Sequence, residues 1–214
     1  MIDISLIKTY GWEAAFRGMR NSWESWDKRD SYRAIYLDEF VIGKNDMELA
    51  SKLAKAGGSE AKFRRMIHIQ CDILAPLYWW KQFDTYKVGT TALSTSTMHT
   101  ITNRDLTIDD FSHASKGIMS AQAGMSLLNT VNVINEIRKL YLEAADQEIK
   151  KMYWYDIIQL LPESFNQLRT VDMNYEVVSH MVHDRRHHKL DEWKEFCKVM
   201  LKELPYSKEL IFDE

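Results

Sequence analysis

The segment APLYWWKQF, residues 75–83, marks the point where a strand gives way to a helix. Residues 66–73, just before it, alternate apolar and polar side chains, which is the pattern of a half-buried strand. Pro76 has no backbone N–H to donate to a neighbouring strand, so pairing should stop near there and the aromatic run should turn helical. The polar tract from Gly89 to Thr97 is rich in threonine and serine, and it predicts an extended loop.

Toward the N-terminus, the sequence predicts a strand and two helices. Residues 2–7 alternate weakly and predict the strand. A second helix is expected to run from an N-cap at Asp46 to Lys55, where Gly57 supplies the backbone freedom that commonly ends a helix. Between these segments, apolar side chains recur every three or four residues and predict a helix with one buried face: Trp12, Phe16, Met19, Trp23 and Trp26.

Toward the C-terminus, the pattern is mostly helical. Helical periodicity extends over residues 115–160 and forms a long segment in the middle of the chain. A short strand is expected over 165–171. Helices over 174–187, with Asp172 as the cap, and over 190–201 complete the chain.

The composition narrows the class of protein. At 214 residues, with 45% hydrophobic and 28% charged residues, the chain is expected to fold as a single domain over residues 1–214. A net charge of −3 provides no broad cationic field for nucleic acid, and no apolar stretch approaches the roughly 20 residues that span a bilayer. Neither nucleic acid nor a membrane is therefore an expected partner. The start of the chain lacks the features of a secretory signal, and Cys71 and Cys197 suggest reduced thiols, so the cytoplasm is the expected location.

The order of these segments resembles the flavin-dependent thymidylate synthases. In that family a strand ends at Ala-Pro, an apolar stretch leads to Arg/Lys-Gln, and a loop with the pattern R-H-R-x-x-S-x-N-E-x-S-x-R-Y follows. Here Ala75-Pro76 and Lys81-Gln82 occupy the first two places. The resemblance implies an α/β (α+β) fold in which helices flank a central sheet.

A second part of the resemblance lies near the C-terminus. After Leu161-Pro162, the family has a strand that contains a threonine, an asparagine that opens a helix, and an arginine eleven residues later. Thr170, Asn174 and Arg185 reproduce this order and spacing. Together the matches span residues 49–193, which is most of the chain.

The chain departs from the family pattern where the family carries its arginines. Residues 86–88, Tyr-Lys-Val, stand opposite R-H-R, while Thr91, Ser96 and His99 align with the two serines and the final tyrosine of the loop. Guanidinium groups bind phosphate and uracil oxygens through paired charge-assisted hydrogen bonds, each about twice as strong as a neutral one. Ordinary methylation of dUMP is therefore not expected.

The resemblance implies a site for a pyrimidine nucleotide, a flavin, or both. The residues expected to bind the nucleotide are Gln82, Lys87, Thr91, Ser94, Ser96, His99 and Arg185. The residues expected to contact the cofactor, FAD, are Ser59, Tyr86, Asn174 and His180. By the same resemblance the protein is a homotetramer with active sites between subunits, and its chemistry is reductive one-carbon transfer to a pyrimidine nucleotide with an altered substrate.

Two other functions remain open from the sequence. A homo-oligomer that keeps the fold without catalysis would bind a small ligand or serve as an interaction protein, and the lost arginines fit this as well. His180, His183 and His187 lie on one face of the predicted helix with Glu176 one turn earlier, a spacing that fits a divalent metal in a hydrolase. The same histidines also fit a polar helix face at a subunit contact.

Overall fold

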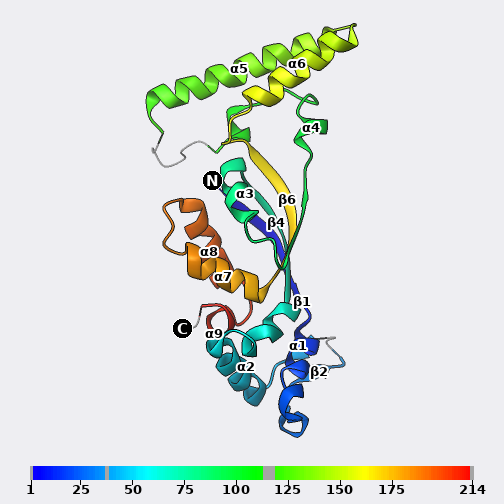
Figure 1. Ribbon diagram of the computed structural model, residues 1–214, viewed down its shortest axis with the longest axis vertical. Coiled ribbons are helices and arrows are strands. Elements are labelled where there is room, and N and C mark those ends of the chain that lie inside the picture. Colours follow the sequence, from blue (N-terminus) through cyan, green and yellow to red (C-terminus); the bar gives the residue numbers. More distant parts are fainter. Residues whose placement is uncertain (1, 37–38, 113–118, 213–214) are drawn as a thin grey trace. The chain divides into compact units, whose positions relative to one another are not determined.

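The computed structural model describes residues 2–36, 39–112 and 119–212 (Figure 1). The strands are β1 (Asp3–Tyr10), β2 (Tyr32–Ala34), β3 (Glu39–Val41), β4 (His68–Pro76), β5 (Thr90–Ser94) and β6 (Asn166–Asn174). The α-helices are α1 (Trp12–Gly18), α2 (Lys44–Ala56), α3 (Leu77–Phe83), α4 (Thr97–Thr100), α5 (Ala121–Glu143), α6 (Gln147–Leu160), α7 (Tyr175–Arg185), α8 (Asp191–Glu203) and α9 (Ser207–Leu210). Short 3-10 helices are η1 (Asn21–Trp23), η2 (Trp26–Lys28), η3 (Glu60–Met66) and η4 (Ile108–Asp110). Within these residues, no helix is both long enough and apolar enough to cross a bilayer.

The central sheet has four antiparallel strands in the order β1-β4-β6-β5. Strand β4 has the predicted alternation, because Ile69, Cys71 and Ile73 are buried while the residues between them are not. The helix predicted after Pro76 is α3. The expectation of an extended loop over the threonine-rich tract is wrong, since residues 90–94 form strand β5 beside β6. β-Branched threonines suit a strand once a partner strand is available.

The chain divides into two compact units. Unit 1 contains Met1–Asp3, Leu74–Asp84 and Leu93–Arg169, and unit 2 contains Ile4–Ile73, Thr85–Ala92 and Thr170–Glu214. Both units are built from segments distant in sequence, and the chain passes between them several times. The single domain expected from the sequence stays a prediction.

In unit 1, the predicted long helical segment is a pair of helices that pack side by side, α5 and α6 (Figure 1). The break comes at Asp146, whose side chain accepts hydrogen bonds from the backbone N–H of Glu148 and Ile149, at 2.9 and 3.0 Å, and so caps α6. The predicted start at Ser115 lies outside the described residues. The core of this unit contains Ile101, Leu106, Phe111, Leu127, Val131, Ile134 and Ile157.

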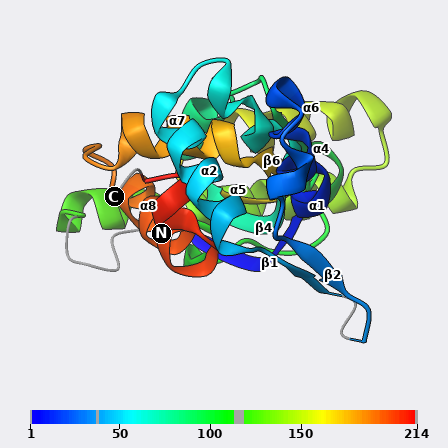
Figure 2. The same cartoon turned by 90° about the horizontal axis from the view of Figure 1, so that it is seen from below.

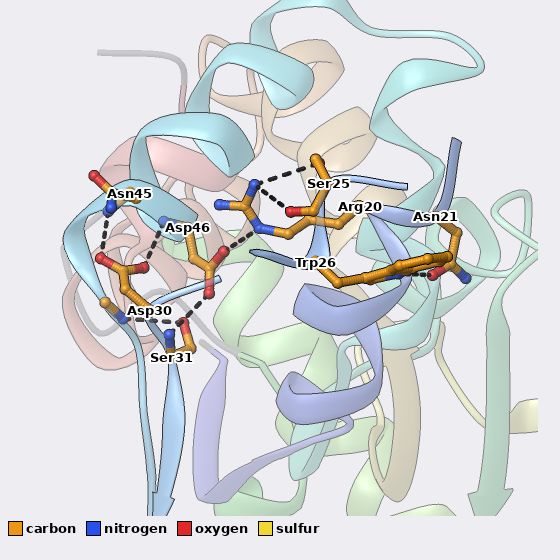
Figure 3. A network of polar contacts seen from close by, with 9 residues as sticks. Arg20, Asn21, Ser25, Trp26, Asp30, Ser31, Asn45 and Asp46 are labelled. Atoms are coloured by element: carbon orange, nitrogen blue, oxygen red, sulfur yellow. Dashed lines mark hydrogen bonds and ion pairs between the residues drawn. The ribbon is translucent and has the colours of Figure 1, made fainter. Parts of the chain in front are cut away.

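In unit 2, a buried polar network holds the N-terminus of α2 (Figure 3). Asp46 accepts hydrogen bonds from Arg20 Nε at 2.6 Å and from the backbone N–H of Ser31 at 3.0 Å. Asp30 accepts from the backbone N–H of Asn45 and Asp46, at 2.8 and 3.0 Å. The predicted N-cap role of Asp46 is therefore wrong, because Asp46 lies inside α2 and Asp30 satisfies the amides of that first turn instead. The predicted end of this helix at Gly57 is confirmed.

The predicted buried stripe after β1 is only partly correct. Helix α1 ends at Gly18, and the chain then forms the short turns η1 and η2. Glu24 adopts a left-handed conformation with φ of 46°, which a continuous helix does not allow. Trp23 is consequently 85% exposed instead of buried. After η2, strands β2 and β3 form an antiparallel hairpin with Tyr32 opposite Val41 (Figure 2).

The C-terminal part of unit 2 packs α7 against both η3 and α8. The expected cap at Asp172 is wrong, because that residue belongs to β6 and the N-cap of α7 is Asn174. Arg64 on η3 is buried and donates to Ser179 Oγ and to the carbonyl of Leu210, at 3.1 and 2.9 Å. The guanidinium thereby ties η3, α7 and α9 together.

Candidate functional site

Arg185, at the C-terminal end of α7, is fixed in orientation by its neighbours. Its Nε donates a hydrogen bond to Tyr86 Oη at 2.9 Å, and Tyr86 Oη donates to Asp184 Oδ2 at 3.1 Å. The guanidinium carbon lies 5.6 Å from the centroid of the Tyr86 ring and 5.3 Å from that of the buried Trp193. Contacts with aromatic faces stabilise a cation. Within the described residues the terminal nitrogens of Arg185 have no hydrogen-bond partner, so this half-buried guanidinium is positioned and open to an anion.

Tyr86 remains a neutral hydroxyl at physiological pH. Burial raises the pKa of Tyr86 above its usual value, and the neighbouring Arg185 acts in the opposite direction. A neutral phenol both donates and accepts hydrogen bonds. Tyr86 therefore links the cation of Arg185 to the carboxylate of Asp184.

The loop before β5 comes very close to Asn174. Asn174 is buried, and its Oδ1 accepts the backbone N–H of Val177 at 2.9 Å as the cap of α7. Gly89 has φ of +85°, and a Cβ atom at that position would lie 2.5 Å from Asn174 Nδ2. Only glycine permits both this backbone conformation and this approach. Asn174 therefore has a structural role, because it caps α7 and packs against the backbone at Gly89.

The remaining predicted residues of unit 2 lie at the surface. Lys87 in the loop before β5, Thr91 in β5 and His180 on α7 are all exposed. The loop is braced by Thr90, whose hydroxyl donates to the carbonyl of Tyr86 at 2.6 Å. In unit 2, the side chains of Tyr86, Arg185 and Asn174 are therefore held by neighbouring residues. Those of Lys87, Thr91 and His180 are exposed to solvent.

The other predicted nucleotide-binding residues belong to unit 1. Gln82 is half-buried on α3, and Ser94 is exposed at the end of β5. Ser96 occupies the N-cap position of α4, although its side chain makes no capping hydrogen bond. His99 is exposed on the same short helix.

Ser59 lines a cleft of about 1520 Å³ in unit 2. The walls come from the end of α1, the turns η1 and η2, α2 and η3. The basic residues of the cleft are Arg20, Lys28, Lys52, Lys62 and Arg65, and the acidic ones are Glu48 and Glu60. Apolar side chains complete the lining: Met19, Trp23, Leu49, Leu53, Phe63 and Met66. The cleft therefore combines apolar surface with an excess of positive charge.

The sequence did not predict this cleft beyond Ser59. Its residues are scattered over 18–66, and no local motif joins them. Helical spacing predicts a buried Trp23, whereas its exposed ring lines the cleft.

The metal hypothesis gains no support from the geometry. Among the described residues, no group of three or more His, Cys, Asp or Glu side chains is arranged to hold a metal ion. His183 is exposed and its nearest carboxylate contact is Asp184, with Nδ1 to Oδ1 at 3.4 Å. His180 and His187 are exposed as well.

Comparisons with known proteins match the fold and not the sequence. No family sequence model matches the chain, and no curated protein does. A solved structure of the flavin-dependent thymidylate synthase of Helicobacter pylori, with FAD and dUMP, has a TM-score of 0.70 at 14% identity. The match covers 100% of this chain and 98% of that one. A UMP/dUMP methylase from Streptomyces cacaoi, bound with 5-Br dUMP, has a TM-score of 0.63 at 14% identity, with 100% and 94% of the two chains covered.

Both matches cover 100% of this chain. The chain adopts the fold of the flavin-dependent thymidylate synthases, at 14% sequence identity to these solved structures.

Proposed function

We propose that this protein binds a flavin together with a pyrimidine nucleotide, and that the cleft of unit 2 holds the flavin nucleotide. The observation that carries the proposal is the cleft itself, with basic side chains around an apolar lining. Structures with the same fold contain FAD and dUMP or a brominated dUMP. Ser59, expected from the sequence to contact the cofactor, lines this cleft.

The residues of the cleft fit FAD by size and chemistry. The volume of the cleft, about 1520 Å³, exceeds the roughly 300–1,000 Å³ of pockets for drug-sized ligands. The cleft is therefore large enough for a dinucleotide. The exposed Trp23 ring offers a surface on which a flat ring stacks, at about 1–3 kcal/mol per base. Lys28, Lys52 and Lys62 supply positive charge for phosphates.

Arg185 is the residue of this proposal that binds the pyrimidine nucleotide. Its terminal nitrogens are open while Nε is held by Tyr86, so the group is oriented before a ligand arrives. Prior orientation lowers the entropic cost of binding. Charge-assisted hydrogen bonds to an anion contribute about 1.5–3 kcal/mol each.

The proposed chemistry is reductive one-carbon transfer to a pyrimidine nucleotide. A bound flavin supplies the hydride, and the protein binds and orients the reactants. The loop 86–99 lacks the arginines of the family pattern, so the substrate is expected to differ from dUMP in the groups those arginines recognise.

The proposed assembly is a cytoplasmic homotetramer, which apolar side chains on α5 and α6 support. The exposed ones are Met125, Leu128, Val133, Leu140, Leu142, Ile149, Met152, Tyr155 and Leu160. Exposed apolar surface of this extent on a helix pair is typical of subunit interfaces. Sedimentation should give a tetramer, and Leu142→Glu should shift the protein to smaller species. A wild-type monomer would contradict the assembly.

The proposal is tested by thermal shift with FAD, dUMP and dCMP. A ligand that binds the folded state raises the melting temperature with concentration by mass action. Arg185→Ala should lower the affinity for the pyrimidine nucleotide by about tenfold or more, while FAD should still raise the melting temperature. Arg104→Ala is the matched control: it removes an arginine of unit 1 that binds Asp110 and the carbonyl of Asp105, and it touches none of the residues proposed to bind the ligands. Indifference of the wild-type protein to all three ligands would refute the proposal.

A further inference from the structure

We infer that Arg65 is the phosphate-binding group of the cleft in unit 2, and that Glu176 is the residue that positions it. The inference rests on the proposed function and adds the part of the ligand that the cleft recognises, a diphosphate. It also assigns a role to Arg65, which the sequence did not single out, and gives Glu176 a role other than the metal ligand considered from the sequence.

Arg65 is presented to the cleft with its guanidinium oriented. It lies on η3 and lines the cleft, and its Nε donates to Glu176 Oε2 at 2.5 Å. The Arg65 side chain is 62% exposed, whereas that of Glu176 is only 13% exposed. Within the described part of the chain, the two terminal nitrogens of Arg65 make no hydrogen bond. The carboxylate therefore holds one edge of the guanidinium and leaves the other edge toward solvent.

Glu176 is well placed to act as that support. It lies in the first turn of α7, directly after the N-cap Asn174 and Tyr175. The positive end of a helix dipole stabilises a carboxylate there. Tyr175 is anchored too, because its backbone N–H donates to the carbonyl of Ile67 at 3.0 Å, just beyond η3. The backbones of Arg65 and Glu176 are thus held together by more than their ion pair.

The other arginine of the cleft is already occupied. Arg20 is 4% exposed, and its Nε is bound to the fully buried Asp46 (Figure 3). Its Nη1 donates to the carbonyl and the hydroxyl of Ser25, at 3.4 and 3.5 Å. Arg20 therefore builds the wall of the cleft, while Arg65 remains available to a ligand.

The lysines of the cleft provide positive charge but no fixed pair of hydrogen-bond donors. Lys28, Lys52 and Lys62 are exposed, and none forms an ion pair with any residue in the described ranges. A lysine is a flexible point charge, whereas a guanidinium matches two phosphate oxygens at once. A diphosphate next to Arg65 gains this paired contact together with the surrounding positive field.

The apolar lining next to Arg65 fits the rest of such a ligand. Phe63 is buried on the same 3-10 helix, and Met66 and Leu53 also line the cleft. A flat, weakly polar ring system packs on such side chains, and the diphosphate lies at the basic edge. The chemical class of the ligand is therefore a nucleoside diphosphate or a dinucleotide that contains one.

The test uses five variants of the 214-residue protein: Arg65→Ala, Arg65→Lys, Arg65→Glu, Glu176→Gln and the charge-swapped double variant Arg65→Glu/Glu176→Arg. Calorimetric titrations measure the affinity for FAD, ADP, inorganic pyrophosphate and riboflavin, which lacks phosphate. Thermal melting without ligand monitors the fold.

Arg65→Ala should lower the affinities for FAD, ADP and pyrophosphate by roughly ten- to hundredfold and leave the affinity for riboflavin unchanged. Arg65→Lys should keep part of the affinity, because it retains the charge and loses the paired geometry. Glu176→Gln should lower the affinities for the three phosphate-containing ligands by a smaller factor, again without changing the affinity for riboflavin. The double variant should recover the melting temperature lost by Arg65→Glu alone and not the affinity for pyrophosphate.

Two outcomes overturn the inference while the proposed function stands: unchanged affinity of Arg65→Ala for FAD and pyrophosphate, or full recovery of affinity in the double variant. The latter would show that the ion pair serves only the fold. Pyrophosphate binding that depends on Arg65 without any flavin binding would support the inference and refute the proposed cofactor. A wild-type protein that binds none of these ligands refutes both.

Discussion

Replacing Asp46 by alanine should destabilise unit 2 strongly and also disturb the cleft. The Asp46 side chain is 0% exposed and that of its ion-pair partner Arg20 is 4% exposed, with Nε to Oδ1 at 2.6 Å. The substitution removes the direct ion pair and leaves the buried guanidinium with its hydrogen bonds to Ser25 and the nearby charge of Asp30. It also removes the acceptor for the backbone N–H of Ser31. Both changes act on the turns that form one wall of the cleft.

The size of the effect follows from the burial of this pair. Removing one partner of a buried ion pair costs about 3–5 kcal/mol, because the remaining charge is left uncompensated. A typical domain has a free energy of unfolding of about 5–15 kcal/mol, so Asp46→Ala should lose a large part of the stability. Asp46→Asn keeps the shape and an acceptor oxygen and should cost less.

Urea denaturation followed by tryptophan fluorescence measures this free energy, because Trp26 lies next to the network (Figure 3). The matched control is Glu13→Ala, which removes an exposed ion pair with Arg33 and should cost about 0–1 kcal/mol. A loss in Asp46→Ala no greater than in the control would refute the reasoning that this network holds the wall of the cleft.

Three further substitutions or conditions give separate checks. Gly89→Ala should destabilise the protein by about 1–3 kcal/mol in thermal denaturation, because φ is +85° and the new Cβ would meet Asn174 at 2.5 Å; no change would contradict that approach. The hydrogen bond from Arg104 lowers the pKa of Asp110, so this carboxylate stabilises the fold above its unfolded pKa near 3.8 and the contribution disappears as pH falls through the lower folded value. Asp110→Asn should flatten the acid limb of the stability curve, and an unchanged limb would argue against the pair. Burial raises the pKa of Cys71 to about 12, so this thiol should resist alkylation at neutral pH until the protein unfolds, as mass spectrometry would show.

Local patterns predicted those elements that depend on local physics. The alternation over 66–73 reflects the two faces of β4, and Pro76 precedes a helix because its fixed φ suits a helix start. Within the periodic segment 115–160, residues 121–143 and 147–160 are helical as predicted, whereas the division at Asp146 depends on a cap that helical periodicity does not reveal.

The predictions that failed concern contacts between distant segments. Strand β5 exists because β6 lies beside it, and nothing within the threonine-rich tract specifies that partner. Trp23 follows helical spacing, but the helix ends at Gly18, so the spacing had no structural meaning there. The pair of Arg65 and Glu176 joins residues 111 positions apart, which a single sequence does not connect.

The candidate site was predicted in outline only. The family resemblance drew attention to Arg185 and Tyr86, which the structure brings within 2.9 Å of each other. It also drew attention to Ser59, which lines the cleft. The basic and apolar residues around Ser59 belong to separate turns and helices, so only the folded chain reveals them as one surface.

The most direct test of flavin binding is the visible absorbance spectrum of FAD as the purified protein is added. We expect the flavin bands to shift and to saturate with increasing protein, and ADP to compete with FAD for the cleft. A spectrum that remains that of free FAD at all protein concentrations would contradict the central claim that this fold retains a flavin site.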